Sequence, residues 1–237
     1  MSDAEFARSL LTREDAHTLV FNKPAGLAVQ GGSGVTKSLE DLLAVFAKSN
    51  GKRPRLVHRL DRETSGIIIA ARTKPAAAFY SAAFASRDAH KTYLAIACGG
   101  APEPRDGEIA FALKKTSRKG LDIMEIARPG EAGVQAALTR YKTFAATPAA
   151  ALIELSPETG RMHQLRAHLA AIGRPIAGDA KYGGLFHLAG TEISSLMLHA
   201  AALDLPHPEG GRRRYEAPLP ETFVKTLRSL GLETPAS

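Results

Sequence analysis

The sequence predicts an α+β protein built on a largely antiparallel sheet. Short apolar segments follow one another along the 237 residues, and glycine, proline or basic turns divide them. The middle of the chain shows this pattern most plainly, with strands expected at 107–113, 121–127, 135–145 and 150–155. Few helical patterns interrupt these segments, and runs of strands broken by a few helices are typical of the α+β class.

Turn and cap signals place most of the other elements. Strands are expected at 18–22 and 27–30 around a Lys23-Pro24-Ala25-Gly26 turn, because proline and glycine divide two apolar runs there. Ser38 is expected to cap a helix that carries Leu39, Leu42, Leu43 and Phe46 at helical spacing. The remaining elements are strands at 66–72, 91–97 and 196–205 and helices at 75–87, capped by Thr73, and at 220–230.

One further helix is expected at 159–173, between a Thr159 cap and Gly173, because glycine suits the left-handed position that follows a helix. Its buried stripe would consist of Met162, Leu165, Leu169 and Ile172. Arg166, four residues after Met162, would lie at the edge of that stripe.

Composition indicates a soluble globular protein, and the length of 237 residues allows one large domain or two small ones. Hydrophobic residues make up 44% and charged residues 23%, and no apolar run approaches membrane-spanning length, so no membrane role is expected. Cys98 is the only cysteine, which excludes an internal disulfide and a cysteine-rich metal site. We expect it to be a buried strand residue. Residues 1–15 lack an apolar signal core, which favours a cytoplasmic location.

The formal net charge of +7 favours an anionic partner without identifying it. Basic residues also gather in three clusters, each of which, taken alone, is more typical of a solvated loop than of a binding surface. The clusters are Lys52, Arg53, Arg55, Arg59 and Arg62; Lys114, Lys115, Arg118 and Lys119; and Arg212, Arg213 and Arg214. Their expected use is sequence-independent contact with phosphates, which weakens steeply as salt rises.

The string His58-Arg59-Leu60-Asp61-Arg62-Glu63-Thr64-Ser65-Gly66 places one carboxylate between two arginines. Nearby positive charge favours the ionised form, so Asp61 is expected to act as a nucleophile or base and not as an acid. Taken alone, the string would also suit a kinase, a hydrolase or a salt bridge. A kinase loop is excluded because Leu60 separates arginine from aspartate, and Gly66 stands where the metal-binding asparagine belongs.

Two other sites are excluded by spacing. The segment 31–38 nearly matches the phosphate loop GxxxxGK[ST], but Thr36 occupies the place of the second glycine, which lets the backbone wrap the phosphates. His163 and His168 are five residues apart, not the four that place two zinc ligands on one helical face.

Six motifs in order along the chain resemble the RluA-type pseudouridine synthase family. They are Lys23-Pro24-Ala25-Gly26, the string 58–66, Lys91-Thr92-Tyr93, the segment 158–168, Gly178-Asp179-Ala180-Lys181-Tyr182-Gly183 and Leu198-His199-Ala200. The resemblance covers nearly the whole chain. It begins by about Leu19, which leaves too little sequence ahead of it for the RNA-binding module that many relatives carry. A single stand-alone catalytic domain over 1–237, with a short N-terminal extension at 1–17, is therefore expected.

The resemblance implies a curved mixed sheet flanked by helices, with a central active-site cleft. It also implies the conversion of uridine to pseudouridine in structured RNA by base flipping, without a cofactor or metal. Asp61 matches the catalytic aspartate of the family, Arg166 the arginine that pairs with it, and Tyr93 the tyrosine that packs against the target base. Arg59 matches the residue that enters the RNA stack, with phosphate binding as its alternative, and a surface position is the alternative for Arg166.

The remaining charged and histidine residues of these motifs are expected to have supporting roles. Arg62 is treated as an electrostatic neighbour of Asp61 and, with the cluster 114–119, as a possible phosphate contact. His58 is expected to support its loop, and His163, His168 and His199 to make local hydrogen bonds. Large-subunit ribosomal RNA and transfer RNA both remain candidate substrates, and a monomer is the simplest expectation. The alternative function is an RNA-binding or assembly factor that keeps the fold without turnover.

Overall fold

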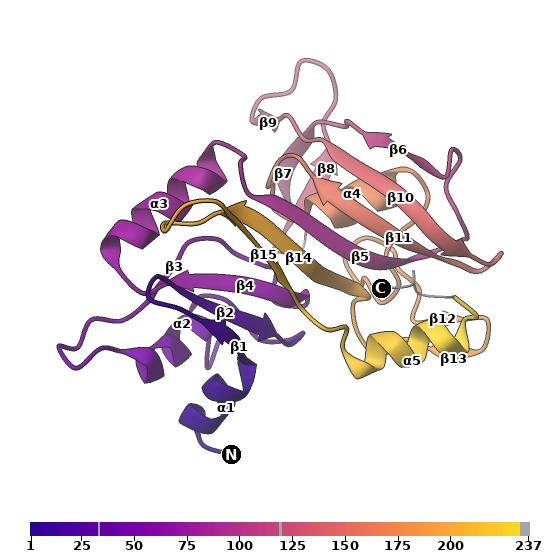
Figure 1. Cartoon of the computed structure of the whole chain (residues 1–237). Helices are drawn as coiled ribbons and strands as arrows, with labels where there is room; N and C mark the ends of the chain where they lie inside the picture. Colours follow the sequence, from indigo (N-terminus) through magenta and orange to yellow (C-terminus); the bar gives the residue numbers. More distant parts are fainter. Residues whose placement is uncertain (33, 119, 233–237) are drawn as a thin grey trace. The chain divides into compact units, whose positions relative to one another are not determined.

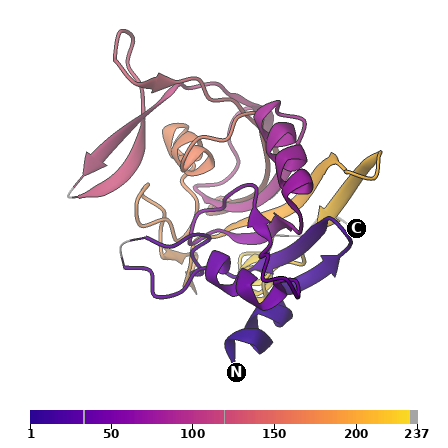
Figure 2. The ribbon, with the colours of Figure 1, turned by 90° about the vertical axis from the view of Figure 1, so that its left-hand side faces the viewer.

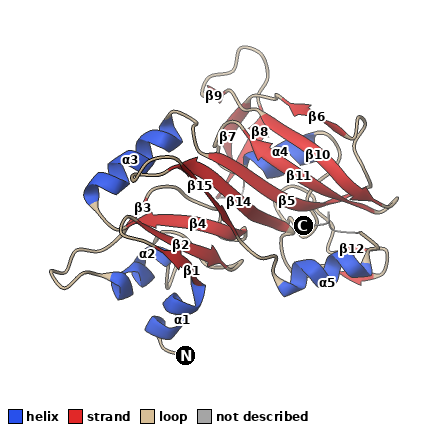
Figure 3. Ribbon diagram, viewed as in Figure 1, coloured by secondary structure: helices blue, strands red, loops and turns tan. Residues whose placement is uncertain are grey.

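The computed structural model describes residues 1–32, 34–118 and 120–232 (Figure 1). The chain divides into two compact units, each assembled from two stretches of sequence. Unit 1 comprises Met1–Lys91 and Ala200–Leu219, and unit 2 comprises Thr92–His199 and Pro220–Ser237. Both units combine antiparallel strands with a few helices, which confirms the predicted α+β class (Figure 3). No helix within the described ranges is long and apolar enough to cross a membrane.

Unit 1 contains the strand order β1-β2-β4-β14, with β3 beside β4 and β15 beside β14. The bounds are β1 (Leu11–Glu14), β2 (Thr18–Lys23), β3 (Arg55–Leu56), β4 (Ser65–Ala71), β14 (Leu198–Pro206) and β15 (Arg212–Glu216). Every residue of β4 is buried, and Ile67, Ile68 and Ile69 are at most 2% exposed. The predicted strands at 18–22, 66–72 and 196–205 are therefore confirmed.

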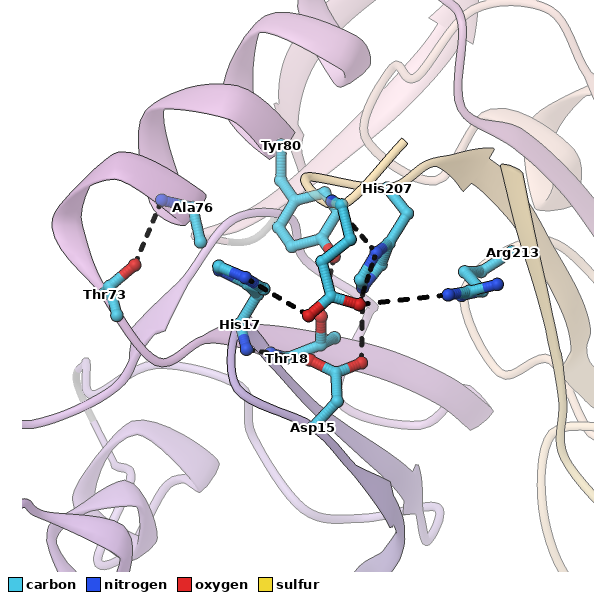
Figure 4. Close-up of polar contacts among 9 residues, drawn as sticks. Asp15, His17, Thr18, Thr73, Ala76, Tyr80, His207 and Arg213 are labelled. Atoms are coloured by element: carbon cyan, nitrogen blue, oxygen red, sulfur yellow. Dashed lines mark hydrogen bonds and ion pairs between the residues drawn. The ribbon is translucent and has the colours of Figure 1, made fainter. Parts of the chain in front are cut away.

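Two of the three α-helices described in unit 1 begin at the predicted caps, Ser38 and Thr73, and the third, α1, was not predicted. They are α1 (Asp3–Leu10), α2 (Leu39–Leu42), which continues as the 3-10 turn η1 (Leu43–Phe46), and α3 (Lys74–Ala85). Ser38 forms a capping box with Asp41, and the Thr73 hydroxyl accepts the Ala76 N–H at 3.2 Å (Figure 4). The predicted strand at 27–30 is wrong, because Ala28 makes only an isolated bridge to Ser38.

Residues 1–17, expected as a short extension, contain α1 and β1, and β1 pairs with β2. A polar cluster joins the turn after β1 to the β14–β15 hairpin (Figure 4). In it the buried His207 places Nε2 3.2 Å from Asp15 Oδ2, and Glu209 lies 3.5 Å from His17. These contacts fasten the N-terminal strand to the rest of unit 1.

Unit 2 contains three groups of strands. The first group has the strand order β5-β11-β10-β6, and all of β5 except its first two residues belongs to unit 2. The strands β8-β7-β9 and β12-β13 form two smaller sheets. The bounds are β5 (His90–Cys98), β6 (Asp106–Ile109), β7 (Leu113–Arg118), β8 (Leu121–Ile126), β9 (Val134–Gln135), β10 (Thr139–Ala146), β11 (Ala150–Pro157), β12 (His187–Leu188) and β13 (Thr191–Glu192). The helices are α4 (Gln164–Ala171), which lies beside the β7–β8 hairpin in Figure 2, and α5 (Glu221–Ser229).

Most predicted elements of unit 2 are confirmed, with three changes among the strands. The predicted strand 107–113 is shorter than expected, because β6 ends at Ile109 and Leu113 begins β7. The basic residues that follow Leu113 were predicted as a turn, but they form β7. Lys114 and Lys115 each reach a carboxylate, Glu131 at 3.5 Å and Asp122 at 2.6 Å, so their charges are compatible with a paired strand. The predicted strand 135–145 is divided into β9 and β10.

The helix predicted at 159–173 is shorter than expected, and Thr159 is not its cap. The Thr159 hydroxyl instead donates to Gln164 Oε1 at 2.7 Å and accepts the Leu138 N–H at 3.0 Å. His163, in the left-handed conformation, precedes α4, while Gly173 follows it with φ +72° as predicted. Residues 164–169 are all buried, so α4 has no single apolar stripe.

Candidate active site

Asp61 lies in a tight turn just before β4. The Thr64 N–H donates to the Asp61 carbonyl at 3.1 Å, which closes the turn. Leu60, immediately before, is 7% exposed, and Asp61 itself is half-buried. The local sequence therefore fixes Asp61 between a buried leucine and the first residues of a buried strand.

The buried side chain of Lys23 fixes this turn through hydrogen bonds to backbone carbonyls. The Lys23 ammonium, on a side chain without exposed surface, donates to the carbonyls of Pro24 at 2.9 Å, Leu27 at 2.9 Å and Arg62 at 3.0 Å. Burial lowers the pKa of Lys23 to about 8, while the carboxylates of Glu63 and Asp61 act in the opposite direction. The three donors of Lys23 thus fasten the Lys23–Leu27 turn to the Asp61 turn.

Arg62 and Gly26 complete the connection between the two turns. The Gly26 N–H donates to the Arg62 carbonyl at 2.9 Å, and Arg62 Nε donates to the Gly26 carbonyl at 3.0 Å. Gly26 has φ +87°, a conformation that favours glycine. Arg62 is therefore a structural partner of this turn as well as a charged neighbour of Asp61, and its contact with phosphate stays a prediction. Arg59, in contrast, is exposed.

His58 and Gly66 fix the two ends of the motif. The Ile69 N–H donates to His58 Nε2 at 3.0 Å, and the imidazole stacks on Phe84 with centroids 4.6 Å apart. Burial, with a smaller effect of the Lys91 charge, lowers the pKa of His58 to about 3, so the ring is neutral and supports the loop as predicted. A Cβ on Gly66 would lie 2.2 Å from the Ala200 carbonyl oxygen, so only glycine fits the start of β4.

Unit 2 carries the other predicted site residues. Tyr93 lies half-buried on β5, in register with Leu155 of β11. Arg166 lies on α4 and is 5% exposed, so its alternative as a surface arginine is wrong. Its Nε and Nη2 donate to the two carboxylate oxygens of Asp179, both at 2.7 Å. The predicted pairing of Asp61 with Arg166 joins residues of the two units and stays a prediction.

The predicted local hydrogen bonding of the histidines is confirmed for two of them. His168 is buried, with Nε2 2.9 Å from the Phe111 carbonyl and Nδ1 3.0 Å from Thr139 Oγ1. His163 Nδ1 lies 3.0 Å from the Tyr182 hydroxyl. Among the described residues, no group of three or more His, Cys, Asp or Glu side chains could hold a metal ion. Cys98 is buried on β5 as predicted, and burial raises its pKa.

One residue of the basic cluster of unit 2, Lys114, lines a pocket. Lys114 and Lys115 both lie on β7 and both form ion pairs, while the Arg118 side chain and Lys119 lie outside the part that the structure describes. A pocket of about 520 Å³ opens between the β7–β8 hairpin and α4. Its lining includes Lys114, Met124, Arg128, Ala167, Ala170 and Tyr182.

Three residues of the site had no role in the sequence analysis, although all belong to recognised motifs. They are Lys23, Asp179 and Tyr182. Their sequence signal was their place in the Lys23–Gly26 and Gly178–Gly183 motifs. The roles depend on partners from other elements, which a linear motif does not identify.

The chain matches the family model "RNA pseudouridylate synthase" over residues 17–171. It is 36% identical over 267 residues to "Pseudouridylate synthase RPUSD4, mitochondrial" of Xenopus tropicalis, which covers 96% of this chain and 82% of the relative. It is also 37% identical over 223 residues to "Ribosomal large subunit pseudouridine synthase C" of Escherichia coli (strain K12), which covers 92% of this chain and 68% of the relative.

Solved structures give the same result. "Human RNA Pseudouridylate Synthase Domain Containing 4" matches with a TM-score of 0.85 and 30% identity, covering 99% of this chain and 98% of the human one. "Human RNA Pseudouridylate Synthase Domain Containing 1" matches with a TM-score of 0.70 and 25% identity, covering 96% of each chain. The sequence motifs, the family model and the fold agree, and the chain therefore belongs to the RluA-type RNA pseudouridine synthase family.

Proposed function

We propose that this enzyme isomerises a uridine of structured large-subunit ribosomal RNA, with Asp61 as its nucleophile or base. One observation carries the proposal: Asp61 stands in a turn that the buried Lys23 fixes through three backbone carbonyls, in a chain of this family. A preorganised carboxylate loses little freedom on reaching the reacting atoms. The ribosomal substrate is suggested by the name of the E. coli relative.

The reaction rearranges bonds within one nucleotide. The bond from N1 of uracil to ribose C1′ breaks, the base turns and C5 bonds to C1′. The C5 proton then leaves and N1 takes up a proton, so the product is an isomer of uridine. Asp61 would attack the nucleotide or abstract a proton, and Tyr93 would pack against the base. Arg166, buried on α4, would hold Asp61 ionised, because a guanidinium favours the charged form of a nearby carboxylate.

The uridine must first leave its stack, which costs a few kcal/mol. Arg59 is exposed and carries a flat guanidinium, so it suits the space that the base vacates. Lys114 and Lys115 would contact phosphates without reading sequence. We further propose that the enzyme acts in the cytoplasm as a monomer, which cell fractionation and light scattering would test.

The test is release of tritium from RNA labelled at uracil C5. Wild type should release label from large-subunit RNA, and Asp61→Asn should not, because the amide is a poor nucleophile and base. Glu40→Gln is the control, since Glu40 is an exposed carboxylate on α2 of the same unit. Release from Asp61→Asn at the wild-type rate would overturn the role of Asp61.

Mapping pseudouridines in cells with and without the gene would identify the substrate. Loss of a site in large-subunit RNA supports the proposal, and loss confined to transfer RNA assigns the other candidate substrate. No release of label by the wild type from any cellular RNA would favour the alternative, an RNA-binding or assembly factor without turnover.

A further inference from the structure

Arg166 is held by a carboxylate from its own unit. The side chains of Arg166 and Asp179 are 6% and 0% exposed, and they form two charge-assisted hydrogen bonds of 2.7 Å. A bidentate pair of this kind fixes the plane of the guanidinium. The direction in which the other N–H groups of Arg166 donate is then set by Asp179.

Asp179 is itself held in place by the turn that follows it. Its Oδ1 accepts the backbone N–H groups of Lys181 at 3.0 Å and Tyr182 at 3.2 Å, and its carbonyl accepts the Gly184 N–H at 2.9 Å. A Cβ on Gly184 would lie 1.9 Å from the Ile176 carbonyl oxygen. The close packing of this turn leaves Asp179 little freedom to move or to follow a displaced arginine.

Tyr182 contacts the same arginine through its aromatic ring. The Arg166 guanidinium carbon lies 5.2 Å from the centroid of the Tyr182 ring, within the range of a cation–π interaction. The Tyr182 hydroxyl accepts the Met124 N–H of β8 at 2.8 Å and lies 3.0 Å from His163 Nδ1. The ring is therefore anchored at its far end to the β7–β8 hairpin and to the residue that precedes α4.

We propose that Asp179 and Tyr182 are positioning residues for Arg166. Asp179 fixes the orientation of the guanidinium, and Tyr182 keeps it in place through a ring anchored to the β7–β8 hairpin. The consequence for catalysis rests on the proposed function, in which Arg166 acts on Asp61. The effect of Asp179 on the orientation of Arg166 does not depend on that function and can be measured without it.

The catalytic test compares Asp179→Asn with a matched control. The amide keeps the size of the side chain but loses the charge and one acceptor, so the guanidinium is no longer fixed by two bonds. We expect kcat to fall by about a hundredfold, as for a misplacement of about 1 Å, with KM for RNA within about threefold of wild type. Glu108→Gln is the control, because it breaks an exposed arginine–carboxylate pair, with Arg140, in the same unit.

Tyr182→Phe and Tyr182→Leu distinguish the contribution of the hydroxyl group from that of the aromatic ring. The first loses the anchor to Met124 and His163, and the second also loses the aromatic face. We expect kcat to fall by about threefold for phenylalanine and about tenfold or more for leucine, as a cation–π contact of about 1 to 2 kcal/mol predicts. Tyr141→Phe is the control, because it removes a hydroxyl that donates to the Pro104 carbonyl at 2.9 Å elsewhere in unit 2.

Chemical rescue supplies a measurement that needs no activity. In Arg166→Ala, millimolar guanidinium should occupy the vacated space against Asp179 and raise the melting temperature. In Arg166→Ala/Asp179→Asn, a variant with no buried charge left unpaired at this place, the same concentration should raise it no more than it does in wild type. Equal stabilisation of the two variants, or a kcat of Asp179→Asn within threefold of wild type, would overturn the proposal. If no RNA is modified by the wild type, the proposed function fails, and the guanidinium measurement still decides the role of Asp179.

Discussion

The candidate site residues of unit 1 and those of unit 2 are held by opposite means. In unit 1 the Asp61 turn is fastened by a buried cation, Lys23, whose three donors all reach backbone carbonyls. In unit 2 the buried cation Arg166 is fixed by a buried carboxylate, Asp179. Carbonyl dipoles compensate a charge less than an opposite charge does, and burial lowers the pKa of Lys23 to about 8 despite its three carbonyl acceptors. Removing one partner of the Arg166–Asp179 pair should therefore cause a large loss of stability, whereas the contribution of Lys23 to stability should depend on pH.

The largest effect is expected from Asp179→Ala, which leaves the buried Arg166 guanidinium without its bidentate carboxylate. Removing one partner of a buried pair typically lowers the free energy of unfolding by about 3 to 5 kcal/mol. Arg166→Met/Asp179→Leu removes both charges and should cost less. Urea unfolding measures both variants. A loss below about 1 kcal/mol for Asp179→Ala would show that the pair does not hold this unit together.

The next effect is a gain of stability at alkaline pH. The pKa of Lys23 falls from 10.5 to about 8 in the folded protein, so the unfolded chain binds more protons between these two values. The free energy of unfolding should therefore rise from about pH 8 to pH 10.5, by at most about 3 kcal/mol. Other groups also titrate in this range, so the measured quantity is the difference between wild type and Lys23→Met. An identical pH dependence of the two proteins would contradict the buried charge.

Lys23→Met should have a smaller effect at neutral pH than Asp179→Ala. The change removes three hydrogen bonds to carbonyls, each worth about 1 to 2 kcal/mol, but it also removes a buried charge that costs about 3 kcal/mol. The two contributions oppose each other, and we expect a net loss of about 1 to 2 kcal/mol by urea unfolding. Lys74→Met, an exposed position on α3, is the control. A loss of unfolding free energy larger than that of Asp179→Ala would contradict the expected order of these two effects.

Several local signals of the sequence are confirmed, whereas the one at Thr159 is overridden by a contact from a distant segment. Ser38 and Thr73 cap helices with residues three positions away, and the apolar run of β4 identifies a buried strand. Thr159 carries an equally good cap signal, but Leu138, from a distant segment, and Gln164 take its hydroxyl instead. Competition of this kind depends on the tertiary fold and leaves no mark in a local pattern.

The site itself shows the same division. The string 58–66 identified Asp61, and the resemblance predicted the distant Arg166 as its partner, with Arg62 as an electrostatic neighbour. Arg62 Nε donates to the Gly26 carbonyl, and the buried Lys23, to which the sequence analysis gave no role, interacts electrostatically with Asp61. Asp179 was visible in its motif, whereas its pairing with Arg166 required the turn that brings it to α4.

The smallest effect is expected at the β7–β8 hairpin, where the charges are solvated. Lys115 and Asp122 form an exposed pair, with both side chains 55% exposed, and such pairs contribute about 0 to 1 kcal/mol. Lys115→Ala should therefore leave the unfolding free energy nearly unchanged. If Lys115 binds a phosphate, the same change should reduce the slope of log Kd for RNA against log salt by about one, equally for all sequences. Lys225→Ala, which removes another exposed, paired lysine of unit 2, should leave the slope unaltered. Equal slopes for Lys115→Ala and wild type would restrict Lys115 to its ion pair with Asp122.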